Sequence, residues 1–350
     1  FVYTRNRHGT LTDFSDDTWD YEAKITPPDS VFYNIFGDTL AISGDTLVIG
    51  DQWDSSLVGR NGAVYVYTRL THGVWSIQQK LIASDYSPYS YFGNDIAIEG
   101  DTIAIGADYA NQLNNNGEIE IDSAGAVYIF TRSNNTWTET KKLIPSDPEV
   151  NKRFGTSIAL SGTTLIIGAP ADGVSRPGAF DEDGAVYVFK NYGFNNWRQY
   201  QKLTPQTTNS NARFGSSVAI EGDTLVIGAN KHSAYDPNSQ SVLSRGAVYI
   251  FNRNSGGSWT ESQILLPTET EEDYFGSNIA IKNGNLVVLS NNAPPHPADN
   301  DTFHFFNLEG QTWTLQHKIS GSDLEEDYYF GYSFALTEDA IMIGARYDDE

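Results

Sequence analysis

The sequence predicts an all-β protein in which one four-stranded unit is written six times. Between successive Phe-Gly pairs, about sixty residues apart, short apolar runs alternate with polar residues at a period of two. These runs are rich in Val, Ile, Thr and Tyr and are separated by turn residues, as is typical of β-strands. A tryptophan opens the fourth run of each unit and gives the same count independently. The Phe-Gly pairs begin at Phe36, Phe92, Phe154, Phe214, Phe275 and Phe330, and the tryptophans are Trp19, Trp75, Trp137, Trp197, Trp259 and Trp313.

Each unit predicts its strands in the same order, which residues 154–170, "FGTSIALSGTTLIIGAP", illustrate for the first two. The first strand follows Phe-Gly, and a tight turn leads to a second strand that ends at Gly-Ala. A variable loop precedes the third strand, which is written "GAVYVF" or similar. A short turn of Asn, Gly or Ser then leads to the fourth strand, which begins at Trp and ends near Lys-Leu. Helical periodicity is absent from the sequence.

Six four-stranded units of this length are the pattern of a β-propeller, whose blades surround a central axis. The first residues, "FVYTR", align with a third strand, whereas residues 330–350 supply only a first and a second strand. We therefore expect a single domain over residues 1–350, in which residues 1 to about 27 complete the blade that begins near 330. Such closure would remove the exposed sheet edges. An open fragment of a longer array is the alternative.

Several repeated positions have a structural explanation. Small side chains fit where blades converge on the axis, glycines permit positive φ or close backbone approach, and the Phe and Trp side chains supply apolar area between blades. We therefore assign the repeated Phe-Gly, Gly-Ala and Trp positions to the scaffold. The alanines expected near the axis are Ala41, Ala97, Ala159, Ala219, Ala280 and Ala335.

The pattern resembles the FG-GAP repeat of integrin alpha subunits and of many bacterial surface proteins. The residues that carry the resemblance are clearest in the third unit, and the fifth unit departs furthest, with "VVLSNN" in place of Gly-Ala. The resemblance implies a β-propeller at the cell surface or outside the cell, within a larger surface protein in some members, with a role in adhesion or recognition. The motif residues of the third unit are Phe154, Gly155, Gly168, Ala169 and Pro170.

Integrin-type repeats often bind calcium in the turn between the first two strands. Here these turns, such as "SGD" and "EGD", are too short to supply six to eight oxygen ligands, so we expect no tight site at Asp45, Asp101 or Asp223. Longer acidic loops elsewhere are candidates for weak Ca²⁺ binding, and plain solvated loops are the competing interpretation. The candidate metal ligands are Asp181, Asp183, Asp273 and Asp327.

Composition restricts the partners and the chemistry. The 350 residues include 45 acidic and 22 basic side chains, a net charge of −23, which argues against binding to nucleic acid or to an anionic membrane. No apolar run is long enough to span a bilayer, so no membrane insertion is expected, and cysteine is absent. No catalytic motif is found and the six histidines are scattered, so we expect a protein that is not an enzyme.

One asymmetry in the loops points to a ligand site. Three residues after the glycine that ends the second strand, units one, two and six carry an aromatic residue, and these units are neighbours in a closed ring. Aromatic side chains beside carboxylates suit sugar rings or peptides. Chance placement in an aromatic-rich chain is the competing explanation. The predicted ligand-binding residues are Trp53, Tyr109, Tyr347, Asp51, Asp54, Asp108 and Asp348.

These observations favour an extracellular, non-catalytic binding or adhesion module whose long loops recognise a glycan or a protein. Two alternatives stay open. One is a propeller enzyme, a hydrolase or a polysaccharide lyase, with a site in the channel or on the loop face. The other is a structural module of a larger surface assembly.

Overall fold

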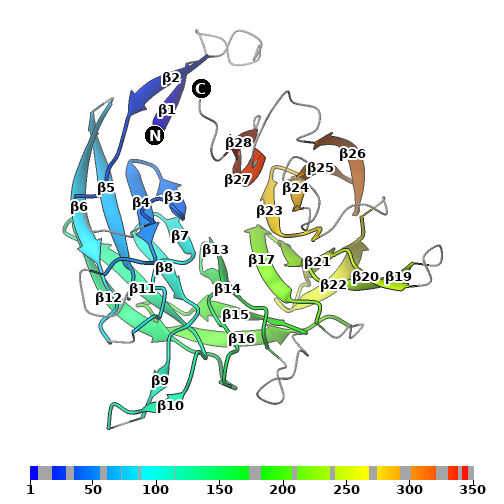
Figure 1. The fold of residues 1–350 in the computed structure, drawn as a ribbon, viewed down its shortest axis with the longest axis horizontal. Coiled ribbons are helices and arrows are strands. Elements are labelled where there is room, and N and C mark those ends of the chain that lie inside the picture. Colours follow the sequence, from blue (N-terminus) through cyan, green and yellow to red (C-terminus); the bar gives the residue numbers. More distant parts are fainter. Residues whose placement is uncertain are drawn as a thin grey trace.

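The computed structural model describes residues 1–6, 18–28, 35–55, 61–71, 73–85, 88–114, 116–172, 183–206, 211–236, 241–267, 274–291, 301–320, 330–337 and 341–345. Every regular element in these residues is a β-strand. Five antiparallel sheets of four strands surround a common centre, and in each sheet the strand that comes first in the chain lies innermost (Figure 1). The predicted all-β class and the four-stranded unit are confirmed.

We number these sheets as blades one to five in chain order. Blade one contains β3 Leu40–Ser43, β4 Thr46–Asp51, β5 Ala63–Thr71 and β6 Val74–Leu81. Blade two contains β7 Ile96–Glu99, β8 Thr102–Ala107, β11 Ala126–Ser133 and β12 Thr136–Leu143. Blade three contains β13 Ser157–Ser161, β14 Thr164–Ala169, β15 Ala185–Asn191 and β16 Trp197–Leu203. Blade four contains β17 Phe214–Glu221, β18 Thr224–Ala229, β21 Ala247–Arg253 and β22 Trp259–Leu265, and blade five contains β23 Asn278–Lys282, β24 Asn285–Ser290, β25 Thr302–Glu309 and β26 Thr312–Ser320.

The remaining strands form two-stranded sheets. Two of these are hairpins inserted between the second and third strands of blades two and four, and the other two lie near the ends of the chain. The inserted hairpins are β9 Gln112–Leu113 with β10 Ile119–Ile121, and β19 Ser233–Asp236 with β20 Ser241–Ser244. The terminal pairs are β1 Val2–Asn6 with β2 Thr18–Ala23, and β27 Phe330–Leu336 with β28 Ile341–Ala345.

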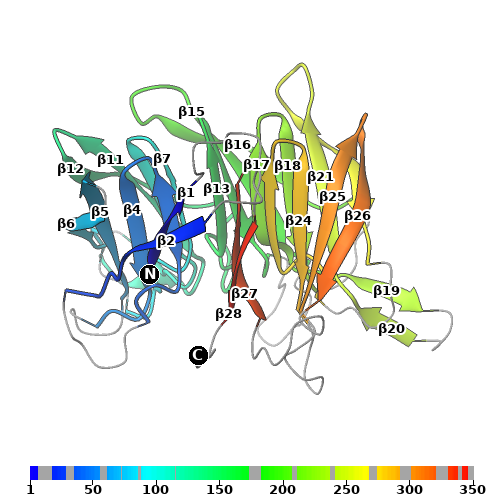
Figure 2. The ribbon, with the colours of Figure 1, turned by 90° about the horizontal axis from the view of Figure 1, so that it is seen from above.

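The expected sharing of one blade by the two terminal pairs is not observed. In the described residues β1 pairs with β2 and β27 pairs with β28, and no ladder joins the two hairpins, so the ring of sheets is not closed in this structure (Figures 1 and 2). Each hairpin pairs two strands that are adjacent in the sequence. A ladder between the two hairpins would pair residues from opposite ends of the chain, and the local alternation of side chains does not specify such pairing.

The β1–β2 hairpin nevertheless contacts blade one in the way that blade one contacts blade two. Glu22 of β2 accepts a hydrogen bond of 2.8 Å from the backbone N–H of Gly73, in the hairpin between β5 and β6. Gln78 occupies the same position in β6 and donates to the carbonyl of Asn135 in the next blade, also at 2.8 Å. At the other end of the ring, β27 lies beside β23 of blade five. Both hairpins therefore pack on the ring at its two ends.

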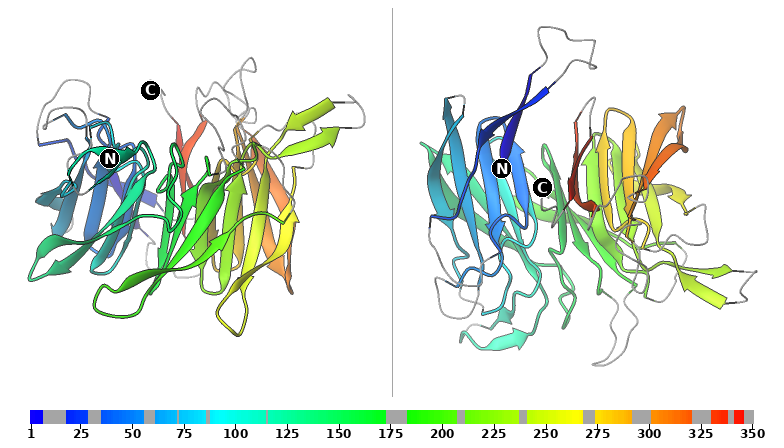
Figure 3. Two further views of the ribbon diagram at one scale, coloured as in Figure 1. Left: turned by 90° about the horizontal axis from the view of Figure 1, so that it is seen from below. Right: turned by 45° about the horizontal axis from the view of Figure 1, so that its top comes forward.

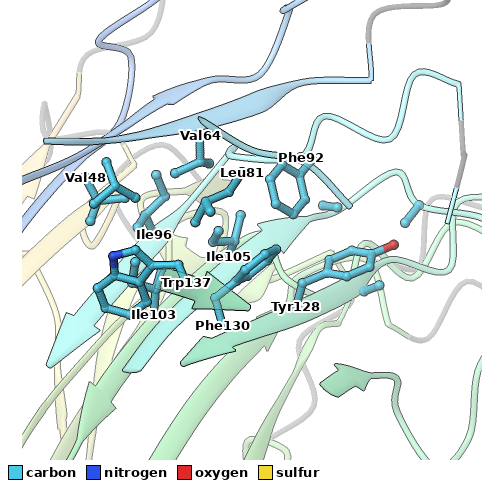
Figure 4. Packing of buried hydrophobic residues seen from close by; sticks show 14 residues of the cluster. Val48, Val64, Leu81, Phe92, Ile96, Ile103, Ile105, Tyr128, Phe130 and Trp137 are labelled. Carbon is cyan, nitrogen blue, oxygen red and sulfur yellow. The ribbon is translucent and has the colours of Figure 1, made fainter. Parts of the chain in front are cut away.

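The apolar core lies between successive blades rather than within one sheet. Figure 4 shows Val48, Val64 and Leu81 of blade one packed against Phe92 and Trp137 of blade two, all of them buried. Burial of each large side chain contributes about 1.5–3 kcal/mol, so every seam adds to stability. The structural roles predicted for the Phe-Gly phenylalanine and the fourth-strand tryptophan are confirmed in blades two to five, whereas Trp19 of β2 is 42% exposed. Alanines of the first strands pack against these clusters at Ala41, Ala97, Ala159 and Ala219.

The Phe-Gly pair forms the centre of a β-turn that attaches one blade to the next. In blade three, the N–H of Thr156 donates to the carbonyl of Arg153 at 3.3 Å, which closes the turn around Phe154 and Gly155. Gly155 has a φ of 98°, a conformation that favours glycine at the third position of a turn. The N–H of Phe154 donates to the carbonyl of Ala124 in blade two at 3.1 Å.

The Gly-Ala-Pro segment is explained by close approach and by a second turn. A Cβ on Gly168 would lie 2.1 Å from the carbonyl oxygen of Gly215, in the Phe-Gly turn of blade four. Pro170 occupies the second position of a turn closed by the N–H of Asp172 and the carbonyl of Ala169, where its fixed φ is favourable. The stretch that identifies the repeat is therefore scaffold.

Candidate functional site

The blades present two different faces. Because neighbouring strands are antiparallel, the turns after the first and third strands lie on one face, which we call the short-turn face. The loops after the second strand and between blades lie on the other, the long-loop face, together with the β19–β20 hairpin (Figures 2 and 3).

The short-turn face repeats one arrangement of a carboxylate, a guanidinium and an indole. In blade two, Asp101 of the "EGD" turn lies 2.7 Å from Nε of Arg132, and this guanidinium lies 5.0 Å from the ring centroid of Trp137. The aspartates of these turns therefore neutralise arginines. Blades one and four repeat the triad with Asp45, Arg69 and Trp75, and with Asp223, Arg253 and Trp259.

A second repeated feature lies beneath the long-loop face. There the tyrosine or histidine of the third strand forms a hydrogen bond with a polar side chain, and we call this group of side chains the polar station of the blade. In blade one, the hydroxyl of Tyr65 donates to Asp54 at 2.6 Å and Nζ of Lys80 lies 2.9 Å from the same carboxylate oxygen. Asp54 is buried, so its predicted place at the edge of a ligand patch is corrected. The backbone hydrogen bonds of Asp54, to the carbonyl of Asp51 and from the N–H of Gly62, fix its place in the loop beside the third strand.

Blade three has the most highly charged station. Lys152 is only 1% exposed, and its Nζ lies 3.2 Å from carboxylate oxygens of both Asp147 and Asp172. Lys202 lies 2.7 Å from the same two residues, and the hydroxyl oxygen of Tyr187, with one proton to donate, lies 2.8 Å from each carboxylate. Burial raises the pKa of Asp147, but the hydrogen bonds from Lys202, Tyr187 and Lys152 outweigh it and lower the pKa to about 2.

Blades four and five each contain a buried histidine at this place. In blade four, Nδ1 of His232 lies 3.0 Å from the hydroxyl of Tyr249, and Ile264 stands where the other stations have lysine. In blade five, His304 takes the place of the tyrosine and lies 3.0 Å from the hydroxyl of Ser290. Burial lowers the pKa of His232 and lowers that of His304 to about 3, so both rings are neutral at pH 7.

The structure places the other predicted ligand residues unevenly. Trp53 is 37% exposed, but Asp51 is fully buried and accepts a hydrogen bond of 3.2 Å from the N–H of Ile35. Burial raises the pKa of Asp51 and raises that of Asp108 to about 6. The expectation of accessible carboxylates around the aromatic residues is therefore corrected for Asp51 and Asp108, because both turn inward from their loops.

Tyr109 lies in a ring cluster on the long-loop face. Its ring meets Tyr91 edge-on, with 4.9 Å between centroids, and the guanidinium of Arg153 lies 4.4 Å from its centroid. Arg153 comes from the next blade, so the cluster spans the boundary between blades two and three. Tyr347 and Asp348 lie outside the described residues.

Of the predicted metal ligands, only Asp183 lies in the described part of the chain, where it is half-buried. Asp181, Asp273 and Asp327 lie outside the described residues. Within the ranges that the structure describes, no three carboxylate or imidazole groups come together as a metal site. Weak Ca²⁺ binding in the acidic loops therefore stays a prediction.

The residue before each Phe-Gly pair is a feature that the sequence analysis missed. In four blades this residue is not glycine and yet has a positive φ between 52° and 56°. Left-handed backbone at a bulky residue costs on the order of 1–3 kcal/mol and is often found at functional sites. Aligning the repeats would have marked this position, because its side chain varies beside a fixed motif. The four residues are Tyr91, Arg153, Arg213 and Tyr274.

The residue before Phe-Gly lies beside the turn that follows the second strand, the turn that carries Trp53 in blade one and Tyr109 in blade two. The N–H of Tyr109 donates to the carbonyl of Ser90 at 3.3 Å, and the N–H of Lys231 donates to that of Ala212 at 3.2 Å, so the two turns of a blade are adjacent. We call the described residues at these two positions the rim. The rim consists of Ile35, Trp53, Tyr91, Tyr109, Arg153, Ala171, Arg213, Lys231 and Tyr274.

Comparison with known families agrees with this architecture. The FG-GAP repeat matches residues 19–67, 75–130, 137–189, 197–251 and 313–350, which is well over half of the chain. The protein therefore belongs to the FG-GAP repeat family of β-propellers. The longest unmatched segment, residues 252–312, contains most of blade five, whose strand order is nevertheless that of the other blades. No curated protein matches the chain.

The described residues contain no helix of the length and apolar character needed to cross a membrane.

Proposed function

We propose that the protein is an extracellular, non-catalytic recognition or adhesion module that binds a glycan or a protein ligand through its long-loop face. The observation that carries this proposal is the rim. Two backbone positions on each blade carry side chains that vary among aromatic, basic and aliphatic residues, whereas three blades repeat a single triad on the short-turn face. Variable side chains held by a rigid scaffold are the usual arrangement of binding surfaces.

Trp53 is the rim residue best suited to anchor a ligand. It occupies the third position of the turn closed by the N–H of Asp54 and the carbonyl of Asp51, and it is 37% exposed. Tryptophan and tyrosine supply large contact areas at a low entropic cost and are enriched among residues that dominate binding energy.

We also propose that the ring contains six blades, with the two terminal hairpins forming the sixth. On β3 of blade one, Leu40 is 62% exposed, whereas Ile96, at the same position of blade two, is 6% exposed because it packs against blade one. Ile42 is exposed in the same way as Leu40. A complete blade before blade one would cover both side chains and contribute about 1.5–3 kcal/mol for each.

The binding proposal is tested by an array of glycans and peptides, screened with and without Ca²⁺, and by Trp53→Ala. We expect this variant to weaken binding of the array ligand by about 2 kcal/mol while its melting temperature stays near that of the wild type. Phe194→Ala is the matched control, because Phe194 is a fully exposed aromatic residue in the β15–β16 turn of the opposite face. If Phe194→Ala weakens binding and Trp53→Ala does not, the ligand binds the short-turn face and the proposal is wrong.

A further inference from the structure

The rim has a charge opposite to that of the molecule as a whole. Acidic residues outnumber basic ones by 45 to 22 in the sequence, yet the described rim contains three basic residues and no acidic one. Arg153 belongs to blade three, and Arg213 and Lys231 belong to blade four. These blades are neighbours, with β13 beside β17 (Figure 1). The cations therefore form one basic segment of the rim.

Arg153 is held in place before any ligand binds. Its φ is 56°, a left-handed backbone conformation that glycine adopts without strain. This conformation sets the direction in which the side chain leaves the backbone. The guanidinium stacks on Tyr109, whose ring also meets Tyr91. A planar guanidinium fixed by stacking keeps its charge and presents its N–H donors in a defined direction, which suits a carboxylate.

The basic segment has aromatic residues on both sides. Tyr91 and Tyr109 lie in blade two, and Tyr274 precedes the Phe-Gly turn of blade five. Asp108 lies buried near Arg153 and interacts with its charge. Arg213 and Lys231 are the basic rim residues of the next blade. The order along the rim is therefore aromatic, basic and aromatic.

We propose that the rim binds an acidic polysaccharide, with uronate carboxylates on Arg153, Arg213 and Lys231 and sugar rings against the flanking aromatic residues. This inference rests on the proposed function and names the class of its ligand. A polyuronate carries a carboxylate on each sugar and a flat face of C–H groups for stacking. An acidic peptide offers carboxylates without such rings, and a neutral glycan offers no carboxylate for the guanidinium and ammonium groups of the rim.

The test measures binding of polygalacturonate, dextran and polyglutamate to the whole chain by biolayer interferometry. We expect polygalacturonate alone to bind and its affinity to fall as salt is raised above about 0.15 M, because charge pairs at an exposed rim are screened. Arg153→Asn, which tolerates left-handed backbone, should weaken binding at least about tenfold, and Arg153→Lys should weaken it less. Arg198→Ala, an exposed arginine on the outer strand β16, is the matched charge control and should leave binding unchanged.

Each outcome separates this inference from the proposed function. Equal binding of dextran or polyglutamate, no binding of polygalacturonate, or equal losses in Arg153→Asn and Arg198→Ala would overturn the acidic-glycan assignment. If an array ligand of another class loses affinity in Trp53→Ala and not in Arg153→Asn, the long-loop face is supported and only the ligand class is wrong. Binding of polygalacturonate that neither Trp53→Ala nor Arg153→Asn weakens would overturn both proposals.

Discussion

The short-turn and long-loop faces are built from the same repeat and differ in what the repeat holds constant. On the short-turn face, three blades present the same triad of aspartate, arginine and tryptophan, exemplified by Asp101, Arg132 and Trp137. On the long-loop face, equivalent rim positions carry tryptophan, tyrosine, arginine, lysine and alanine. The chemistry that repeats joins the strands within each blade, and we propose that the side chains that vary at a fixed backbone position serve recognition.

The polar stations refine this comparison, because they lie on the long-loop side but consist of buried side chains that stabilise the blades. Blade three uses two lysines and two aspartates, whereas blade four replaces a lysine with Ile264 and an aspartate with His232. Charge and counter-charge are thus lost together. The proposed ligand surface is therefore limited to the rim, and the buried stations beneath it belong to the scaffold.

The largest effect is expected at the station of blade three. Asp172→Ala removes one of two carboxylates that hold the buried Lys152, and we expect unfolding free energy to fall by about 3 kcal/mol in urea denaturation. Asp101→Ala is the control on the short-turn face, where the aspartate side chain is 68% exposed, and should cost less than about 1 kcal/mol. Similar losses in the two variants would contradict the assignment of the station as the stronger structural element.

A pH-dependent effect distinguishes the histidine stations from the charged ones. The folded-state pKa of His304, about 3, lies below its ordinary value of 6.5, so the folded state resists its protonation. Its contribution to stability is complete above pH 6.5 and is lost as the pH falls, by about 1.4 kcal/mol for each unit between 6.5 and 3. Between about pH 7.5 and 5, the wild type should therefore lose about 2 kcal/mol more than His304→Gln, which stays neutral.

The difference between the two proteins isolates this effect from groups that act in the opposite direction. Burial raises the folded-state pKa of Asp95 to about 7 and that of Asp108 to about 6, so these carboxyls favour the folded state as the pH falls toward 3.8. Both groups are present in the wild type and in His304→Gln, and their contributions cancel. Parallel pH profiles of the urea midpoint for the two proteins would show that His304 is protonated without cost.

The sequence predicted most of the scaffold because the scaffold repeats. Phe154 and Trp137 recur at fixed places in the unit, and their burial between blades follows from alternation and turn residues alone. Blade five was predicted correctly although "VVLSNN" replaces its Gly-Ala, because its Phe275 and Trp313 keep the unit in register. Ring closure depends on pairing between opposite ends of the chain, which no local pattern specifies.

The candidate site was predicted only in part because side-chain direction depends on contacts between strands. Asp54 and Trp53 are neighbours in one loop, but the first turns inward to Tyr65 and Lys80 while the second stays exposed. Arg153 was missed because its significance lies in a left-handed backbone and in Tyr109 of the preceding blade. Neither property can be read from a single unit of the repeat.

The most direct test of the division between a structural face and a proposed recognition face compares Arg132→Ala with Trp53→Ala for thermal stability and for binding of the ligand selected on the glycan and peptide array. Arg132→Ala removes an ion pair, a stacking contact and a hydrogen bond to Thr46, so it should lower the melting temperature and leave the affinity of the folded protein unchanged. Trp53→Ala should do the reverse, with a loss of about 2 kcal/mol in binding and a melting temperature near that of the wild type. A fall in melting temperature for Trp53→Ala as large as that for Arg132→Ala, with unaltered binding, would show that the rim is scaffold and would contradict the account.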